Sequence, residues 1–385
     1  MRKRRKLWLF FTAILLLLAL PRAAFAAEGS FASAKKVSFG KNVSGSLTET
    51  SPERWYSFTL PSSGRTMLHA SSYTQRTNYR ICDPSGKEVW SKENVRKSSS
   101  TGKSRIDETI DLKSGTYYLS VDSKYFLINR YYGKFVFRID YTAADESFPE
   151  TNRKEEPGLA DSPAVSFGKT IRGQIAANED QDAFRFTVPG DGIVTLKAKA
   201  GMRYLWYNLY DANGSQLWTR HAVWDSKSGS SYFTVSLALR AGKYYLAAAK
   251  DRYTGPYAFR LTYKKVDVTF PETDEKQNGS TDTAVRITPG QTVRGLIALN
   301  NETDYYKFSL SSAKTLRVQA AAYTKYIAYT ILNSRGETVW SSTPRSSATS
   351  GKSRVDETAR FSKGTYYFVA KKVGNNTGRY IFQLS

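Results

Sequence analysis

Residues 102–121 read GKSRIDETIDLKSGTYYLSV, and residues 351–370 read GKSRVDETARFSKGTYYFVA. A third version, GSSYFTVSLALRAGKYYLAA at residues 229–248, keeps the glycine and the two tyrosines near the end but lacks the charged start. Self-similarity at this scale is the signature of a chain built from repeated structural units. The rest of the sequence is therefore interpreted by aligning it with itself.

The alignment extends well beyond these stretches. A glycine 13 residues before a phenylalanine and a tryptophan after a glycine turn recur three times, at Gly45, Gly173 and Gly295 and at Trp90, Trp218 and Trp340. The sequence predicts repeat 1 (34–142), repeat 2 (160–264) and repeat 3 (282–385), joined by acidic linkers at 143–159 and 265–281. At about 105 residues, each repeat is the size of a domain and not of a solenoid unit.

Within each repeat the pattern is that of β-strands. The segment FVFRIDY places Phe135, Phe137, Ile139 and Tyr141 on one face, with polar residues between most of them. Such alternation, with clusters of Gly, Asn, Asp and Ser every 8–14 residues, indicates short antiparallel strands in a sandwich. The predicted fold is all-β, with three tandem antiparallel β-sandwiches.

The G-x-[IL] start, the acidic loops before DAFRF and DYYKF, the GTYYL stretch and the closing G-x-Y-x-F-x-L resemble the bacterial pre-peptidase C-terminal domain. The collagen-binding domains of secreted bacterial collagenases are similar. The resemblance covers nearly all of the mature chain, three times over, and it implies jelly-roll-like sandwiches. Members of this family are usually appended to secreted hydrolases, whereas this chain carries no catalytic domain beside its repeats.

The N-terminal residues predict export. A basic start, MRKRRK, precedes a 14-residue apolar run and the small-residue site Ala24-Phe25-Ala26, so residues 1–26 are interpreted as a cleaved signal peptide. The run is shorter than the roughly 20 residues of a membrane span, although an uncleaved anchor is the alternative. We expect a secreted protein with no transmembrane segment after cleavage and, since Cys82 is its one cysteine, no internal disulfide.

The charge of the chain favours anionic partners. The formal net charge is +23, and removing the six basic residues of the leader leaves +17. Basic repeats joined by acidic linkers are unlike a nucleic-acid-binding arm, so no specific nucleic acid is expected. An extracellular polysaccharide or an anionic wall polymer is the expected partner, and the positive charge would retain the protein at the cell surface.

The charged start of the opening stretch distinguishes the outer repeats from the middle one. Lys103, Arg105, Lys352 and Arg354 are predicted to be exposed, paired with neighbouring carboxylates on the same strands. The corresponding segment of repeat 2, YFTVSLAL, is apolar on both faces. Our hypothesis is that a flanking domain or a partner covers it.

Aromatic residues that do not recur mark a candidate ligand site in repeat 2. Trp206 projects where the other repeats have small residues, and Trp224 is unique to this repeat. The predicted platform for a sugar or peptide comprises Trp206, Trp224, Tyr204, Arg220 and His221, with a domain contact as the alternative. Strict alternation would turn Tyr204 inward. The recurring tryptophans, including Trp218, are predicted to fill the core between the sheets.

The residues give little support for catalysis. His69 and His221 lack the partners of a zinc site, and Cys82 replaces residues that are apolar or aromatic in the other repeats. We expect no enzyme activity.

The acidic loops suggest calcium. Repeat 2 reads ANEDQDAF and repeat 3 reads NNETDYY, so the candidate ligands are Glu179, Asp180, Asp182, Glu302 and Asp304. The resemblance implies that an acidic segment entering the domain completes each site, here through Glu155, Glu156, Asp274 and Glu275. Hydrogen bonding of Asp182 and Asp304 to the turn backbone is the alternative.

The predicted function is that of a secreted, non-catalytic, multi-domain binding protein. Carbohydrate is the first candidate ligand, and a matrix protein such as collagen is the second. The alternatives are a partner or scaffold subunit of a separately encoded secreted hydrolase and a hydrolase with an unadvertised site.

Overall fold

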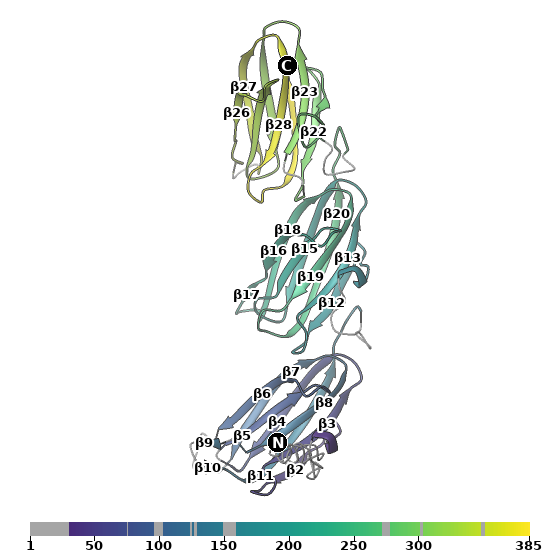
Figure 1. Cartoon of the computed structure of the whole chain (residues 1–385), viewed down its shortest axis with the longest axis vertical. Helices are drawn as coiled ribbons and strands as arrows, with labels where there is room; N and C mark the ends of the chain where they lie inside the picture. The colour runs from purple at the N-terminus through teal and green to yellow at the C-terminus, as the bar shows by residue number, and fades with distance from the viewer. Residues whose placement is uncertain are drawn as a thin grey trace, which may run out of the picture. The chain divides into compact units, whose positions relative to one another are not determined.

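The computed structural model describes residues 31–385 except 75, 96–102, 124, 127–128, 149–158, 272–277, 301–302 and 348–350. The predicted leader therefore lies outside the described residues. The described chain is all-β apart from two short 3₁₀ turns, η1 (Phe31–Ser33) and η2 (Leu159–Asp161), which confirms the predicted fold class (Figure 1). Two compact units are present: unit 1 comprises 1–59, 67–108 and 116–140, and unit 2 comprises 60–66, 109–115 and 141–385.

Repeat 1 forms a five-stranded sheet, β1-β3-β8-β5-β6, a four-stranded sheet, β2-β11-β4-β7, and a small hairpin, β9-β10. Its strands are β1 (Lys35–Lys36), β2 (Val43–Leu47), β3 (Glu53–Leu60), β4 (Gly64–Ser72), β5 (Arg76–Cys82), β6 (Glu88–Val95), β7 (Ser104–Leu112), β8 (Gly115–Asp122), β9 (Tyr125–Phe126), β10 (Asn129–Arg130) and β11 (Gly133–Ala143).

Repeat 2 forms the sheets β12-β20-β14-β18-β17 and β13-β19-β15-β16. Its strands are β12 (Thr170–Ile175), β13 (Gln181–Val188), β14 (Gly192–Ala200), β15 (Trp206–Tyr210), β16 (Gln216–His221), β17 (Val223–Asp225), β18 (Ser230–Leu239), β19 (Gly242–Ala249) and β20 (Gly255–Lys265).

Repeat 3 returns to the arrangement of repeat 1, with the sheets β21-β23-β28-β25-β26 and β22-β29-β24-β27. Its strands are β21 (Val285–Arg286), β22 (Thr292–Ile297), β23 (Thr303–Leu310), β24 (Lys314–Ala322), β25 (Ile327–Asn333), β26 (Thr338–Ser342), β27 (Ser353–Phe361), β28 (Gly364–Lys372) and β29 (Gly378–Leu384). The short edge strands β1 and β21 pair in parallel with β3 and β23, whereas all other ladders described are antiparallel. In repeat 2 a single parallel bridge, Ala164 to Arg185, takes the place of that edge strand.

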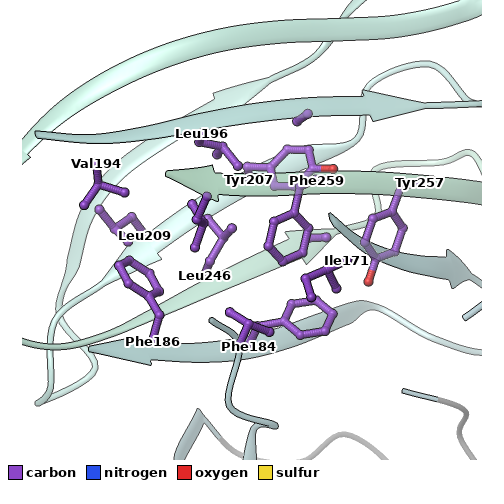
Figure 2. Packing of buried hydrophobic residues seen from close by; sticks show 14 of the residues in the cluster. Ile171, Phe184, Phe186, Val194, Leu196, Tyr207, Leu209, Leu246, Tyr257 and Phe259 are labelled. Atoms are coloured by element: carbon purple, nitrogen blue, oxygen red, sulfur yellow. The ribbon is translucent and has the colours of Figure 1, made fainter. Parts of the chain in front are cut away.

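Alternation along the strands produces the core of each sandwich. In repeat 2, Phe184 and Phe186 of β13 point toward Tyr207 and Leu209 of β15 and Leu196 of β14 (Figure 2). All five are buried. Each such burial contributes about 1.5–3 kcal/mol, so the core stabilises the fold without disulfides.

The recurring glycine is explained by a close approach to an aromatic ring. A Cβ on Gly173 would lie 2.3 Å from the hydroxyl oxygen of Tyr257, and one on Gly295 would lie 2.2 Å from the ring of Tyr380. The equivalent glycine of repeat 1 faces Phe135 in the same way. Glycine is therefore the residue that lets this ring pack between the sheets.

The apolar strand β18 is partly covered, as we hypothesised from its sequence. Ala238 packs in a buried cluster with Leu296 and Ala298 of repeat 3, and the amide of Leu299 donates to the carbonyl of Ala238 at 3.0 Å. Tyr232, at the other end of β18, is 57% exposed. The hypothesis thus holds for the C-terminal half of the strand and not for its start.

Candidate functional site

The strands β15 and β16 bring two of the predicted ligand-binding residues together. Trp206 begins β15 and lies directly opposite His221, which ends β16. The next residue, Tyr207, points into the core and is fully buried, so Trp206 and His221 share the outer face. Their ring centroids are 4.8 Å apart in an edge-on arrangement.

Tyr204 joins them, contrary to the orientation that strict alternation predicted. It precedes β15 with φ of +54°, a left-handed conformation uncommon for a residue other than glycine. This backbone turn breaks the alternation and leaves Tyr204 45% exposed, with its ring 6.0 Å from that of His221. The correction has a local cause, because a positive φ redirects the side chain.

A fourth member was missed by sequence reasoning. Tyr253, in the loop between β19 and β20, is 40% exposed, and its ring lies 6.1 Å from that of Tyr204. The loops at this place differ in length between repeats, so comparison of equivalent positions could not single it out. We call Tyr204, Trp206, His221 and Tyr253 the aromatic surface.

Two predicted members lie elsewhere. Trp224 is on β17, at the edge of the other sheet, where the guanidinium of Arg203 sits 5.2 Å from its ring. Arg220 is opposite Tyr207, on the other face of β16 from His221, and its guanidinium lies 5.3 Å from the ring of Phe233. The structure therefore separates Trp224 and Arg220 from the aromatic surface.

The recurring tryptophans are not the buried core residues that we predicted. Trp90, Trp218 and Trp340 are each half-buried on the strand that ends a sheet. Trp218 packs against the core beside Phe233, and Trp340 donates from Nε1 to Glu357 at 3.1 Å. An edge strand has a neighbour on one side only, so these rings close the sandwich and keep one face in solvent.

The predicted calcium ligands Asp182 and Asp304 are engaged with tyrosines. Each is nine-tenths buried or more, and each accepts a hydrogen bond from a hydroxyl, that of Tyr257 at 2.6 Å or that of Tyr380 at 2.5 Å. Burial, together with the nearby carboxylate, raises the pKa of both tyrosines well above its usual value. The protonated hydroxyl thus stays a donor to the carboxylate. Figure 2 shows the oxygen of Tyr257 at the rim of the repeat 2 core.

Cations from the preceding repeat lie against the same loops within unit 2. The amine of Lys113 is 2.9 Å from Glu179, and the guanidinium of Arg240 is 3.5 Å from Asp304. Lys113 and Arg240 hold equivalent places, each two residues before the glycine of G-x-Y-Y. The exposed Asp180 is 3.9 Å from Lys250.

These carboxylates do not converge as calcium requires. Calcium takes six to eight oxygen ligands, whereas no three His, Cys, Asp or Glu side chains gather anywhere in the part of the chain that the structure describes. Glu302 and the acidic linker residues lie outside that part. The described residues therefore do not fit a calcium site, and calcium binding stays a prediction.

No helix within the described residues is long and apolar enough to cross a membrane.

Comparison with known proteins places the chain among β-rich extracellular modules. No protein family and no curated protein matches it. Among solved structures it is similar to the pre-peptidase C-terminal domain of collagenase from Bacillus anthracis, with 19% identity and a TM-score of 0.23 over 26% of this chain and 94% of that one. A protein of Eubacterium rectale described as secreted matches at 11% identity and a TM-score of 0.19, over 56% and 73% of the two chains. The CUB1-EGF-CUB2 domains of human MASP-1/3 match at 10% identity and a TM-score of 0.17, over 56% and 99%.

Proposed function

We propose that this chain is an exported, non-catalytic binding protein whose repeat 2 binds an extracellular polysaccharide through the aromatic surface. The observation that carries the proposal is the row of partly exposed rings formed by Tyr204, Trp206, His221 and Tyr253 on one end of the sandwich. Exposed aromatic groups rimmed by polar atoms are typical of binding surfaces.

The chemistry of these side chains suits sugars. Aromatic rings offer flat apolar faces to the C–H groups of a pyranose, while phenol, indole and imidazole groups supply hydrogen bonds at the edges. The neighbouring Arg203 is exposed and adds a charged rim. Trp206 corresponds to Asn78 and Ala328 in the other repeats, so its ring adds no necessary packing to the sandwich.

A protein ligand is the second candidate, and one observation favours it. Val223 and Tyr232 lie opposite each other on β17 and β18 and are 59% and 57% exposed. An edge strand with exposed apolar side chains can accept an extended peptide.

Binding, and not hydrolysis, is the proposed mode of action. The ring of His69 is held between Asp107, at 2.6 Å, and Asp140, at 3.3 Å. Cys82 is buried, and burial raises the pKa of its thiol, which disfavours the reactive thiolate. Both side chains that could have served as base or nucleophile are thus part of the scaffold.

Export through the leader and retention by charge complete the proposal. A mature charge of +17 attracts the protein to anionic cell-surface polymers, and this attraction weakens as salt is added. Binding through the aromatic surface does not share that salt dependence.

The test uses the mature chain on a glycan array at low and high salt. Trp206→Ala should weaken saccharide binding by about 1–3 kcal/mol, as loss of a stacking anchor does, and should leave the melting temperature nearly unchanged. Tyr232→Ala, which removes an exposed ring outside the aromatic surface, is the matched control and should bind like the parent.

Three results would overturn the proposal. Saccharide binding that survives Trp206→Ala would exclude the aromatic surface. Loss of binding in Tyr232→Ala alone would favour the edge of β17 and β18. Release of sugar products by the purified chain would make it an enzyme, and sugar binding only with a co-purifying hydrolase would make it a partner subunit.

A further inference from the structure

The charged stretch that opens both outer repeats surrounds an exposed tyrosine. In repeat 3 the ring of Tyr323, 40% exposed, has the amine of Lys352 4.7 Å and the guanidinium of Arg379 3.9 Å from its centroid. In repeat 1 the ring of Tyr73, 48% exposed, has the amine of Lys103 at 5.0 Å. Contacts of this length are attractive cation–π interactions.

The same backbone contact positions both groups. The amide of Tyr323 donates to the carbonyl of Arg379 at 2.9 Å, and the amide of Tyr73 donates to that of Lys134 at 2.9 Å. We call these sets the tyrosine–cation clusters: Tyr323, Lys352, Arg354 and Arg379 in repeat 3, and Tyr73, Lys103, Arg105 and Lys134 in repeat 1. Repeat 2 replaces every member, with Gly201, Ser230, Tyr232 and Pro256.

The cluster of repeat 3 carries uncompensated positive charge. The nearest acidic residue on β27, Asp356, is held by Arg317 through two hydrogen bonds of 2.6 and 2.7 Å. A hydrogen bond from Lys352, and then the charges of Lys352, Arg379 and Arg354, lower the pKa of Tyr323. In repeat 1, by contrast, Arg105 lies 3.5 Å from Asp107. The repeat 3 cluster is therefore the stronger anion attractor.

A hollow of about 320 Å³ adjoins the repeat 3 cluster. It lies over β24, β27 and β29 and is lined by Arg354, Gln319, Gln383, Ala321 and Ile381 among others. Its size is that of a small ligand pocket, and its amide groups suit hydroxyl-bearing ligands. A single surface thus combines three cations with a polar hollow.

We infer that the repeat 3 cluster binds a polysaccharide bearing sulfate or phosphate groups, and that the repeat 1 cluster is a weaker second site. Cations held over a tyrosine ring lose less side-chain freedom when they engage an anion, which favours binding. The amide-lined hollow beside them accommodates a sugar, and this favours a glycan over a lipid surface or a nucleic acid. This inference is independent of the aromatic surface on repeat 2.

The test compares two triple variants of the mature chain. The first is Lys352→Gln, Arg354→Gln, Arg379→Gln. The second, the control, is Lys314→Gln, Arg335→Gln, Arg360→Gln, which removes the same charge from exposed sites of repeat 3 outside the cluster. The probes are dextran sulfate, dextran phosphate and unmodified dextran, measured by biolayer interferometry over a salt series.

We expect the parent to bind a charged dextran and not the unmodified one. The cluster triple should bind roughly tenfold or more weakly, and its log–log salt slope should fall by about one unit per lost cation. The control triple should stay within about twofold of the parent, as expected for exposed charges outside the site. Whichever charged dextran binds identifies sulfate or phosphate as the recognised group.

Further arms keep the inference falsifiable. Equal weakening by both triples would reduce it to bulk charge, and tighter binding to a DNA duplex or to phosphatidylglycerol vesicles would replace the glycan. Arg354→Gln alone, at an exposed strand position, repeats the test should the triple variant fail to fold. Trp206→Ala should leave dextran sulfate binding unchanged, so that failure here is distinguishable from failure of the function proposed for repeat 2.

Discussion

Repeats 2 and 3 share a backbone at the place where their surfaces differ most. The amide of Gly201 donates to the carbonyl of Pro256 at 2.8 Å, just as the amide of Tyr323 donates to that of Arg379. Repeat 3 builds a tyrosine–cation cluster on this contact, whereas repeat 2 leaves the place bare and builds the aromatic surface from Tyr204 and its neighbours. One scaffold thus supports two chemistries, because the recurring glycines and core rings are separate from the residues that meet the solvent.

A second difference separates repeat 1 from the repeats that follow. Asp304 and Tyr380 form a buried pair in repeat 3, and the corresponding residues of repeat 1 are Arg54 and Phe135. The carboxylate and its hydroxyl donor are therefore present or absent together.

The largest expected effect comes from breaking that pair. Asp304→Ala leaves the buried guanidinium of Arg240 without this carboxylate, and breaking a buried ion pair costs about 3–5 kcal/mol. Denaturant unfolding of the mature chain measures the loss. The control, Asp180→Ala, removes a carboxylate that is 86% exposed and should cost less than about 0.5 kcal/mol. Equal costs would show that Asp304 is not part of a buried network.

Alkaline pH should destabilise repeat 3 through its buried tyrosines. Burial raises the pKa of Tyr306 and Tyr380, so their stabilisation is complete below pH 10 and is lost as pH rises above the value of the unfolded chain. At a pH of about 11 each contributes a loss of roughly 1 kcal/mol.

Absorbance titration of tyrosinate, followed together with circular dichroism, checks this. The exposed Tyr323 should ionise first and without loss of β-structure, because its pKa is lowered. Complete ionisation of all tyrosines in a chain that keeps its β signal would contradict the expectation.

A smaller effect is expected from moving the cluster into repeat 2. Gly201→Tyr with Ser230→Lys and Pro256→Arg recreates three of its members; a Cβ on Gly201 would meet Pro256 at 3.2 Å, and that ring is removed in the same variant. Binding to dextran sulfate should rise by a few-fold at most, since each exposed charge contributes less than about 1 kcal/mol. Weaker binding than the parent would show that the cluster depends on more than these positions.

The smallest effect is expected from calcium. The described carboxylates of the acidic loops are already paired with Tyr257, Tyr380, Lys113 and Arg240, so the melting temperature should be the same in calcium and in chelator. Calorimetry of the mature chain measures it. A rise with calcium would assign the loops to the metal, since a ligand that binds only the folded state stabilises it.

The sequence predicted those features that depend on neighbours along the chain. Alternation identified the strands, and comparison of repeats identified Trp206 as an outward residue. His221 was interpreted as a loop residue, but pairing with β15 extends β16 to include it. Local pattern cannot show pairing with a distant strand.

The remaining features depend on tertiary contact. The positive φ of Tyr204 is a single-residue departure from the strand pattern. The partner of Asp304 is Arg240, 64 residues earlier and in another repeat, and no spacing rule connects them. The half-burial of Trp218 follows from its place on an edge strand, which only the sheet order reveals.

The cation that each repeat presents to the next gives the array a reading direction. Lys113 and Arg240 meet the acidic loops that follow them, whereas the equivalent residue of repeat 3 is the uncharged Ser362. Arg54 of repeat 1, in turn, has the wrong sign to receive a cation. Repeat 2 alone carries both halves of the connection. Recombination that shuffled these modules would therefore set like charges together or leave a carboxylate unmatched, so an array of this kind can lengthen by duplicating its middle module but cannot be rearranged freely.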